Sequence, residues 1–196
     1  MTLKVLGVGS SMRNDSFSTE TLKLILKKVN QNGADIKLLD LNINPLPIYY
    51  HKTSKDMIYT QLVTGMVNWA DAFILATPDY HGSMSGSLKN FLDYFWSEFA
   101  GKTFGYICAS HEKGLTVMDQ MRTVIRQCYG WSLPYGISIN SYQDFNEKRE
   151  ISNNSILMRL DSLARDLVVY GSLINEQFKK DLKSTINNSF AVRYRK

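Results

Sequence analysis

The 196-residue sequence has little cysteine and proline and no long apolar segment. Its two cysteines, Cys108 and Cys128, form no CxxC pair, and Cys108 lies in an apolar run typical of a reduced core residue. No apolar run approaches the roughly 20 residues of a membrane span, and the N-terminus lacks the residue order of a signal peptide. We therefore expect a cytoplasmic protein without a membrane segment.

The chain also lacks a strong excess of one charge. It has 23 Lys and Arg against 18 Asp and Glu, which gives a net charge of +5. The basic residues are spread along the chain, apart from the closing segment 193–196, and no stripe of basic and aromatic residues follows one element. We expect no nucleic-acid partner, and the positive charge favours solubility and the attraction of anionic small molecules.

Familiar nucleotide and metal motifs are absent. No Gly-Lys-Ser/Thr sequence ends a Walker A loop, and the dinucleotide fingerprint GxGxxG has Met12 in place of its third glycine, which disfavours a classical Rossmann site. Leu115 stands where an HExxH motif beginning at His111 needs its second histidine. Because His51 and His81 lie far from His111 in the sequence, we expect no metal.

Apolar runs alternate with helical stripes along the whole chain. The runs predict strands at 3–8, 36–41, 72–76, 103–109 and 133–139, and the stripes predict helices that include 22–29, 58–70, 88–99, 117–128 and 157–171. Near-continuous apolar strands are typical of a parallel sheet covered on both faces. The length suits one domain. We predict a single α/β domain over residues 1–196, with a basic C-terminal tail at 185–196.

The loop after the first strand carries several serines and one arginine, Arg13, just before a helix. A helix N-terminus stabilises an anion by about 0.3–1 kcal/mol. Each hydrogen bond from a serine to a phosphate adds about 1.5–3 kcal/mol, because the acceptor is charged. The loop therefore suits a phosphate monoester, and the alternative is a polar turn with a serine N-cap.

Two further loops follow the third and fourth strands. The segment 77–86 is rich in small residues, and 109–114 carries His111. In the flavodoxin-like strand order 2-1-3-4-5, strands one, three and four are neighbours, so their carboxyl ends form one cleft at the switch point of the sheet. We therefore predict a three-layer sandwich with a five-stranded parallel sheet and a ligand in that cleft. The alternative for His81 and His111 is that they are simply exposed loop residues.

Two of these loops resemble a known family. The segment Thr77–Tyr94, TPDYHGSMSGSLKNFLDY, resembles the TPEYNGSxPGxLKNxIDW signature of the NADPH-dependent FMN reductase family. Ser11–Ser18 resembles the S-x-R-x-x-S-x-N phosphate loop of the same family, and Gln120–Arg126 is similar to a helix of azoreductase-like members. The resemblance covers roughly residues 3–175.

The resemblance implies an FMN site made by all three loops. The residues it assigns to the cofactor in the first loop are Ser11, Arg13, Ser16, Phe17 and Ser18, of which the three serines and the arginine would hold the phosphate. Those it assigns to the flavin ring are Pro78, Asp79, Tyr80, His81, Gly82, Ser83, Ser110, His111 and Gly114. The sequence departs from the family at Asp79, where Glu is usual, at His81, where Asn is usual, and at Ser110-His111, where two glycines are common.

The resemblance also implies an activity. Hydride would pass from NADPH or NADH, via FMN, to a quinone, azo compound, free flavin or similar small-molecule acceptor by a ping-pong mechanism. The cofactor would carry this chemistry, so no catalytic side chain is expected. One alternative is a flavodoxin-like electron carrier that docks on partner proteins, which the basic charge and the missing T-x-T-G-x-T loop disfavour. Another is a flavodoxin-like binding or regulatory domain without redox activity.

The helix after the second loop bears on the oligomeric state. Tyr94, Phe95, Trp96 and Phe99 make it apolar around more than one face. Exposed aromatic patches usually mark an interface. We therefore expect a homodimer or a homotetramer, and the alternative is that other parts of the same chain cover these rings.

Overall fold

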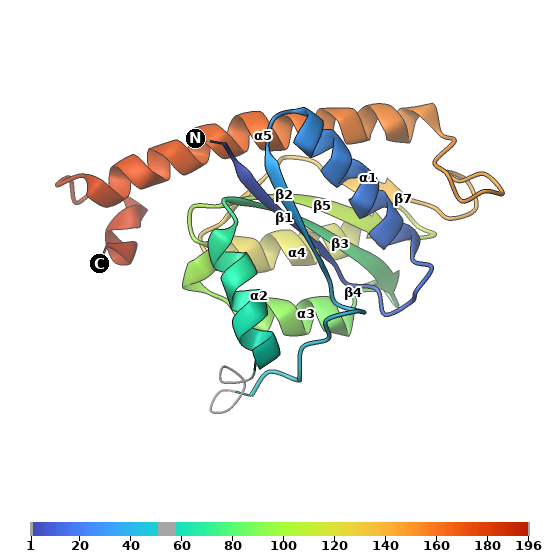
Figure 1. Cartoon of the computed structure of the whole chain (residues 1–196), viewed down its shortest axis with the longest axis horizontal. Helices are drawn as coiled ribbons and strands as arrows, with labels where there is room; N and C mark the ends of the chain where they lie inside the picture. The colour runs from blue at the N-terminus through green and yellow to red at the C-terminus, as the bar shows by residue number, and fades with distance from the viewer. Residues whose placement is uncertain (1, 51–57, 196) are drawn as a thin grey trace.

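The computed structural model, which describes residues 2–50 and 58–195, has three layers (Figure 1). The main parallel strands of the central sheet are β1 (Lys4–Gly9), β2 (Asp35–Asp40), β3 (Ala72–Tyr80) and β5 (Thr103–Ala109). Two helices cover one face, α1 (Phe17–Gln31) and α5 (Asn154–Lys183). Three cover the other, α2 (Ile58–Trp69), α3 (Gly86–Asp93) and α4 (Leu115–Gln127). The predicted α/β sandwich is confirmed.

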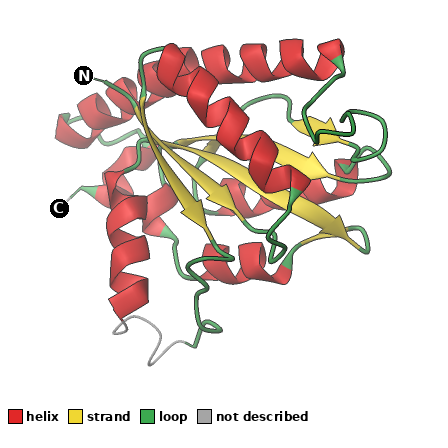
Figure 2. Cartoon of the chain, turned by 45° about the vertical axis from the view of Figure 1, so that its right-hand side comes forward, coloured by secondary structure: helices red, strands yellow, loops and turns green. Residues whose placement is uncertain are grey.

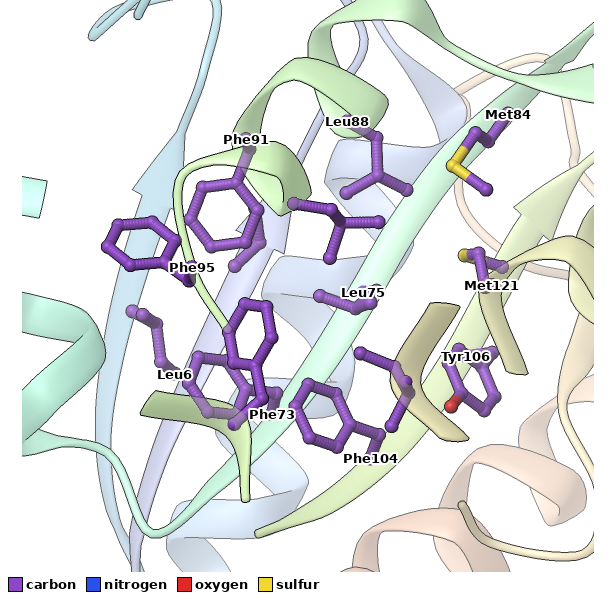
Figure 3. Close-up of a cluster of buried hydrophobic side chains, with 14 of the residues drawn as sticks. Leu6, Phe73, Leu75, Met84, Leu88, Phe91, Phe95, Phe104, Tyr106 and Met121 are labelled. Atoms are coloured by element: carbon purple, nitrogen blue, oxygen red, sulfur yellow. The ribbon is translucent and has the colours of Figure 1, made fainter. Parts of the chain in front are cut away.

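Each face of the sheet has its own hydrophobic core. The α1 stripe of Leu22, Ile25 and Val29 is fully buried on one face, as its helical spacing predicts. On the other face, Phe91 and Phe95 lie in one buried cluster with Phe73 and Phe104 of the sheet (Figure 3). Burying each such ring contributes roughly 1.5–3 kcal/mol, so the two cores fix the sheet between its helices.

The predicted number of five strands was wrong, and the additional short strands give the observed order different labels from the predicted 2-1-3-4-5. The sheet has seven strands, and its main path is β2-β1-β3-β5-β6, with β4 (Ser83–Met84) beside β3 and β7 beside β5. The run expected as one strand at 133–139 is instead divided into β6 (Trp131–Ser132) and β7 (Ile137–Ile139). Pro134 lies between them and has no N–H to donate to the ladder, which ends the first piece.

The helix expected through residue 99 ends earlier. α3 stops at Asp93, and a 3-10 turn, η1 (Ser97–Phe99), follows it. The break lets Phe99 pack edge-on against Phe73, with ring centroids 5.4 Å apart. Tyr94, Phe95 and Phe99 are all buried within the chain, and Trp96 alone of the four rings is exposed, at 64%. The apolar helix face on which we based the oligomer prediction is therefore mostly internal core.

The C-terminal segment folds back on the molecule. α5 runs to Lys183, well beyond the predicted stripe, and a 3-10 turn, η2 (Phe190–Tyr194), follows in the expected basic tail. Phe190 of that turn stacks on Phe178 of α5, with centroids 5.4 Å apart, and on Tyr129. The tail thus packs beside the edge strand β6. Among the described residues, no helix has the length and apolarity to cross a membrane.

Candidate functional site

A cavity of about 600 Å³ lies where the loops after β1, β3 and β5 meet. These parallel strands end at one edge of the sheet, toward which the arrowheads point in Figure 2. The cavity brings together most of the residues predicted from the sequence. The predicted residues that line it are Ser11, Arg13, Ser16, Phe17, Pro78, Asp79, Tyr80, His81, Gly82, Ser110 and His111.

Three predicted site residues lie outside the cavity lining: Ser18, Ser83 and Gly114. Ser18 is fully buried behind Ser16, and their hydroxyl oxygens are 2.9 Å apart. The Ser83 hydroxyl donates to Gln120 Oε1 at 3.0 Å, so it holds a turn in place. Gly114 ends the third loop before α4, away from the cavity. Ser18 and Ser83 therefore support the cavity wall from behind.

The loop after β1 offers donors for an anion. Ser16 caps α1, because its hydroxyl accepts the N–H of Thr19 at 3.3 Å. The N–H groups of Phe17 and Ser18 remain at the open end of the helix, where no intrahelical partner exists. The Arg13 guanidinium makes no hydrogen bond or ion pair within residues 2–50 and 58–195, so its donors are free to meet a ligand.

Buried hydroxyls fix this loop to the start of α3. Ser10 donates to Ala76 O at 2.9 Å, and Ser85 donates to the backbone oxygen of Ser10 at 3.0 Å. Thr77 accepts the N–H of Ser85 at 3.0 Å. Since Ser10, Thr77 and Ser85 are all buried, these bonds are shielded from water and hold the β1 loop, β3 and α3 in one position.

The loop after β3 is a tight hairpin. Tyr80 pairs with Ser83 across a two-residue turn, and both central residues have positive φ, 56° at His81 and 77° at Gly82. This is the pattern of a type I′ turn, which favours Asn-Gly. Asn stands at the position of His81 in the family signature, and histidine also tolerates positive φ better than most residues.

Asp79 and Gln120 hold this hairpin against its neighbours. One carboxylate oxygen of Asp79 accepts the N–H of Gly82 at 2.8 Å, and the other accepts the hydroxyl of Ser110 at 2.8 Å. Gln120 of α4 donates to Gly82 O at 3.2 Å and accepts from Ser83. Asp79, which is one methylene shorter than the glutamate usual in the family, therefore links the second and third loops. The sequence pattern did not reveal this role.

The third loop turns sharply around a buried cysteine. Gly114 has φ of 56°, and a Cβ there would lie 2.6 Å from Cys108 Sγ. Burial raises the pKa of the Cys108 thiol to about 12, so it stays protonated and is no nucleophile at neutral pH. His111 stacks on Tyr142, with ring centroids 5.4 Å apart. Among the described residues, no three His, Cys, Asp or Glu side chains could hold a metal ion, and His51 lies outside those residues.

A fourth segment, 140–151, closes the cavity and was missed by the sequence reasoning. The Arg149 guanidinium lies over the Phe17 ring at 4.0 Å, donates to Asp15 O and pairs with the Asp15 carboxylate at 3.7 Å. Phe145 also contacts Phe17, at 4.5 Å between centroids. Further lining residues that we did not predict are Asp15, Ala109, Glu112, Ser141, Tyr142 and Arg149. The segment has no periodic pattern, and a positive φ at Arg149 cannot be seen in the sequence.

Comparisons with known proteins agree with this geometry. The sequence model of the family described as "NADPH-dependent FMN reductase" matches residues 3–144, which is more than half of the chain. That match includes the loops after β1, β3 and β5 and ends before Arg149.

Two individual relatives show the level of sequence identity. An NADPH azoreductase of Bacillus sp. (strain OY1-2) is 33% identical over 102 residues, which cover 50% of this chain and 57% of the azoreductase. An NAD(P)H-dependent FAD/FMN reductase of Geobacillus thermodenitrificans is 26% identical over 141 residues, which cover 69% of this chain and 75% of that reductase. The chain thus spans little more than half of the first relative's length.

Solved structures share the fold. A flavoenzyme NAD(P)H:(acceptor) oxidoreductase from Paracoccus denitrificans superposes with a TM-score of 0.72 at 17% identity. The superposition covers 88% of this chain and 98% of the other. A likeness at this identity shows a common flavodoxin-like fold.

Proposed function

The chain belongs to the NADPH-dependent FMN reductase family, and from that premise we propose that it is an FMN-dependent NAD(P)H oxidoreductase acting on small-molecule acceptors. Quinones, azo compounds and free flavins are the acceptor classes that suit this proposal. The names of the Bacillus and Geobacillus relatives support it.

The cavity has the volume and the hydrogen-bond donors that FMN needs. Its volume of about 600 Å³ falls within the roughly 300–1,000 Å³ of typical cofactor sites. One end offers a free guanidinium at Arg13, the hydroxyl of Ser16 and the open N-terminus of α1, a donor set suited to a terminal phosphate. The other end lies between the hairpin at Tyr80–Gly82 and the loop at Ser110–His111, where a planar ring system fits.

When bound, FMN would supply the hydride and electron transfer between donor and acceptor. The protein's own residues bind and orient. Arg13 and Ser16 would hold the phosphate, and Asp79 keeps the two ring-binding loops at a fixed separation through Gly82 and Ser110. Ser18 and Ser83 support the lining from behind. No side chain is required as a nucleophile or general base.

The observation that carries the proposal is the free Arg13 guanidinium beside the α1 N-terminus, at one end of a cavity of cofactor size. An absorbance spectrum of the purified protein tests it directly. We expect a flavin spectrum, and chromatography of the released chromophore should identify FMN. Finding only FAD, or no binding after reconstitution with excess FMN, would falsify the proposal.

We propose a ping-pong mechanism, in which donor and acceptor occupy the open side of the cleft in turn. Steady-state oxidation of NADPH with a quinone should give parallel lines in double-reciprocal plots. Turnover in the absence of a partner protein also separates this enzyme from a flavodoxin-like electron carrier. Intersecting lines would reject the shared site.

We further propose one domain over residues 1–196, in the cytoplasm, acting as a homodimer or a dimer of dimers. The free thiols of Cys108 and Cys128 are compatible with a reducing compartment. Exposed apolar side chains at Ile48 and Trp96 remain for a subunit contact. Light scattering at micromolar concentration should show at least a dimer, and a fully active monomer would refute this assembly.

A further inference from the structure

A second cavity, of about 1030 Å³, adjoins the first. Ser110, His111 and Glu112 line both, so the third loop forms a ridge between them. The far wall of the second cavity comes from α4, from the segment around β7 and from the start of α5. A ligand that leaves the first cavity over this ridge therefore enters the second.

Three cationic side chains line this second cavity, and each comes from a different element. They are Lys113 of the third loop, Arg122 of α4 and Arg159 of α5. Arg122 pairs with Asp119 through one nitrogen at 3.0 Å, and Arg159 donates to Gly136 O at 2.8 Å. These contacts, with that of Arg122 over the Tyr106 ring at 5.8 Å, orient both guanidinium groups and leave further N–H donors for a ligand.

Two carboxylates line this cavity, and one of them is engaged in hydrogen bonds. Asp144 is buried, and its carboxylate accepts the N–H of Asn140 at 2.7 Å and the side-chain amide of Asn153 at 2.6 Å. Glu112 is the other carboxylate, and it lies on the ridge. The lining therefore carries three cationic side chains against two carboxylates, an excess of one positive charge, which favours an anionic ligand.

The size and position of the cavity indicate which anion. A nicotinamide that reaches a flavin in the first cavity carries a second nucleotide half, which must lie outside that cavity. The second cavity is as large as typical nucleotide sites and is reached across the ridge. A guanidinium fork recognises a phosphate monoester better than it recognises a ribose hydroxyl.

We propose that this second cavity binds the adenosine half of NADPH, with Arg122 and Arg159 donating to its 2′-phosphate. The inference rests on the proposed function and deepens it, because it makes the enzyme prefer NADPH to NADH. The two arginines are 37 positions apart in sequence, and only the packing of α4 and α5 around β7 places them on one cavity.

Binding of adenosine 2′,5′-bisphosphate to the FMN-loaded protein, measured by calorimetry, tests the proposal without turnover. The wild type should bind it at least tenfold more tightly than adenosine 5′-monophosphate, which lacks the 2′-phosphate. Arg159→Gln changes an exposed residue and should weaken the bisphosphate roughly tenfold or more, as expected for one charged hydrogen bond, and leave the monophosphate unchanged. Arg122→Gln should do the same.

Arg126→Gln is the matched control, because Arg126 lies on α4 but lines neither cavity. Arg122→Gln and Arg159→Gln, but not the control, should also lower the preference for NADPH over NADH, measured as the ratio of the two KM values. If NADPH reduces quinones but Arg159→Gln keeps the wild-type bisphosphate affinity and KM ratio, the proposal is overturned while the enzyme function stands. An equal loss of affinity for the bisphosphate and the monophosphate would indicate an unspecific anion site and would also overturn the proposal. A protein that takes up no FMN fails earlier, at the proposed function itself.

Discussion

Replacing Arg149 should weaken FMN binding even though the phosphate-loop signature remains intact. Arg149→Asn removes the guanidinium and keeps a residue type that tolerates the φ of 62° at this position. The change deletes the contact with the Phe17 ring, the hydrogen bond to Asp15 O and the ion pair with Asp15. All three hold the loop that ends in the α1 N-terminus.

The size of the effect follows from these contacts. A cation–π contact at a partly exposed site contributes about 0.5–1 kcal/mol. The hydrogen bond adds about 1 kcal/mol after discounting for solvent. The ion pair adds little, because its side chains are 41% and 66% exposed. If most of this energy orders the loop for the phosphate, the loss is about 1–2 kcal/mol, or a roughly fivefold to thirtyfold higher Kd for FMN.

Quenching of flavin fluorescence during titration of the apoprotein measures this Kd. Riboflavin lacks the phosphate, so its affinity should change much less than that of FMN. Arg165→Asn is the control, since Arg165 is an arginine of α5 that lines neither cavity. An FMN affinity within twofold of wild type, with the thermal stability unchanged, would refute the idea that segment 140–151 positions the phosphate loop.

Substitutions at Arg13, His81 and Lys102 test other parts of the structure. Arg13→Ala should raise the Kd for FMN about tenfold to a hundredfold and leave the Kd for riboflavin unchanged. An unchanged Kd for FMN would mean that the loop serves only to cap the helix. His81→Val puts a β-branched residue at positive φ, so denaturant unfolding should show a loss of roughly 1–2 kcal/mol, whereas His81→Asn should be neutral. Burial lowers the pKa of Lys102 from 10.5 to about 8, so the unfolded chain binds more protons between those values and stability should rise with pH across them. Lys102→Met should flatten that rise, and a parallel pH profile in the variant would contradict the shift.

Local sequence patterns were enough to predict the layers and the three loops that follow β1, β3 and β5. The apolar runs and the α1 stripe are short-range signals, and burial of each requires a sheet covered on both faces. The serines and Arg13 before α1, and the small residues after β3, lie next to elements whose type the pattern already fixes. Their meeting at one edge then follows from the geometry of parallel strands.

Tertiary structure decided the rest, because it depends on contacts between residues far apart in the chain. Pro134 interrupts a run that is apolar enough for one strand, and α3 ends at Asp93, which lets Phe99 pack against Phe73. The contact of Arg149 with Asp15 joins segments 134 residues apart, and Arg122 and Arg159 line one cavity only after α4 and α5 pack. A polar side chain in an irregular segment carries no periodic signal, so its role appears only when the fold supplies its neighbours.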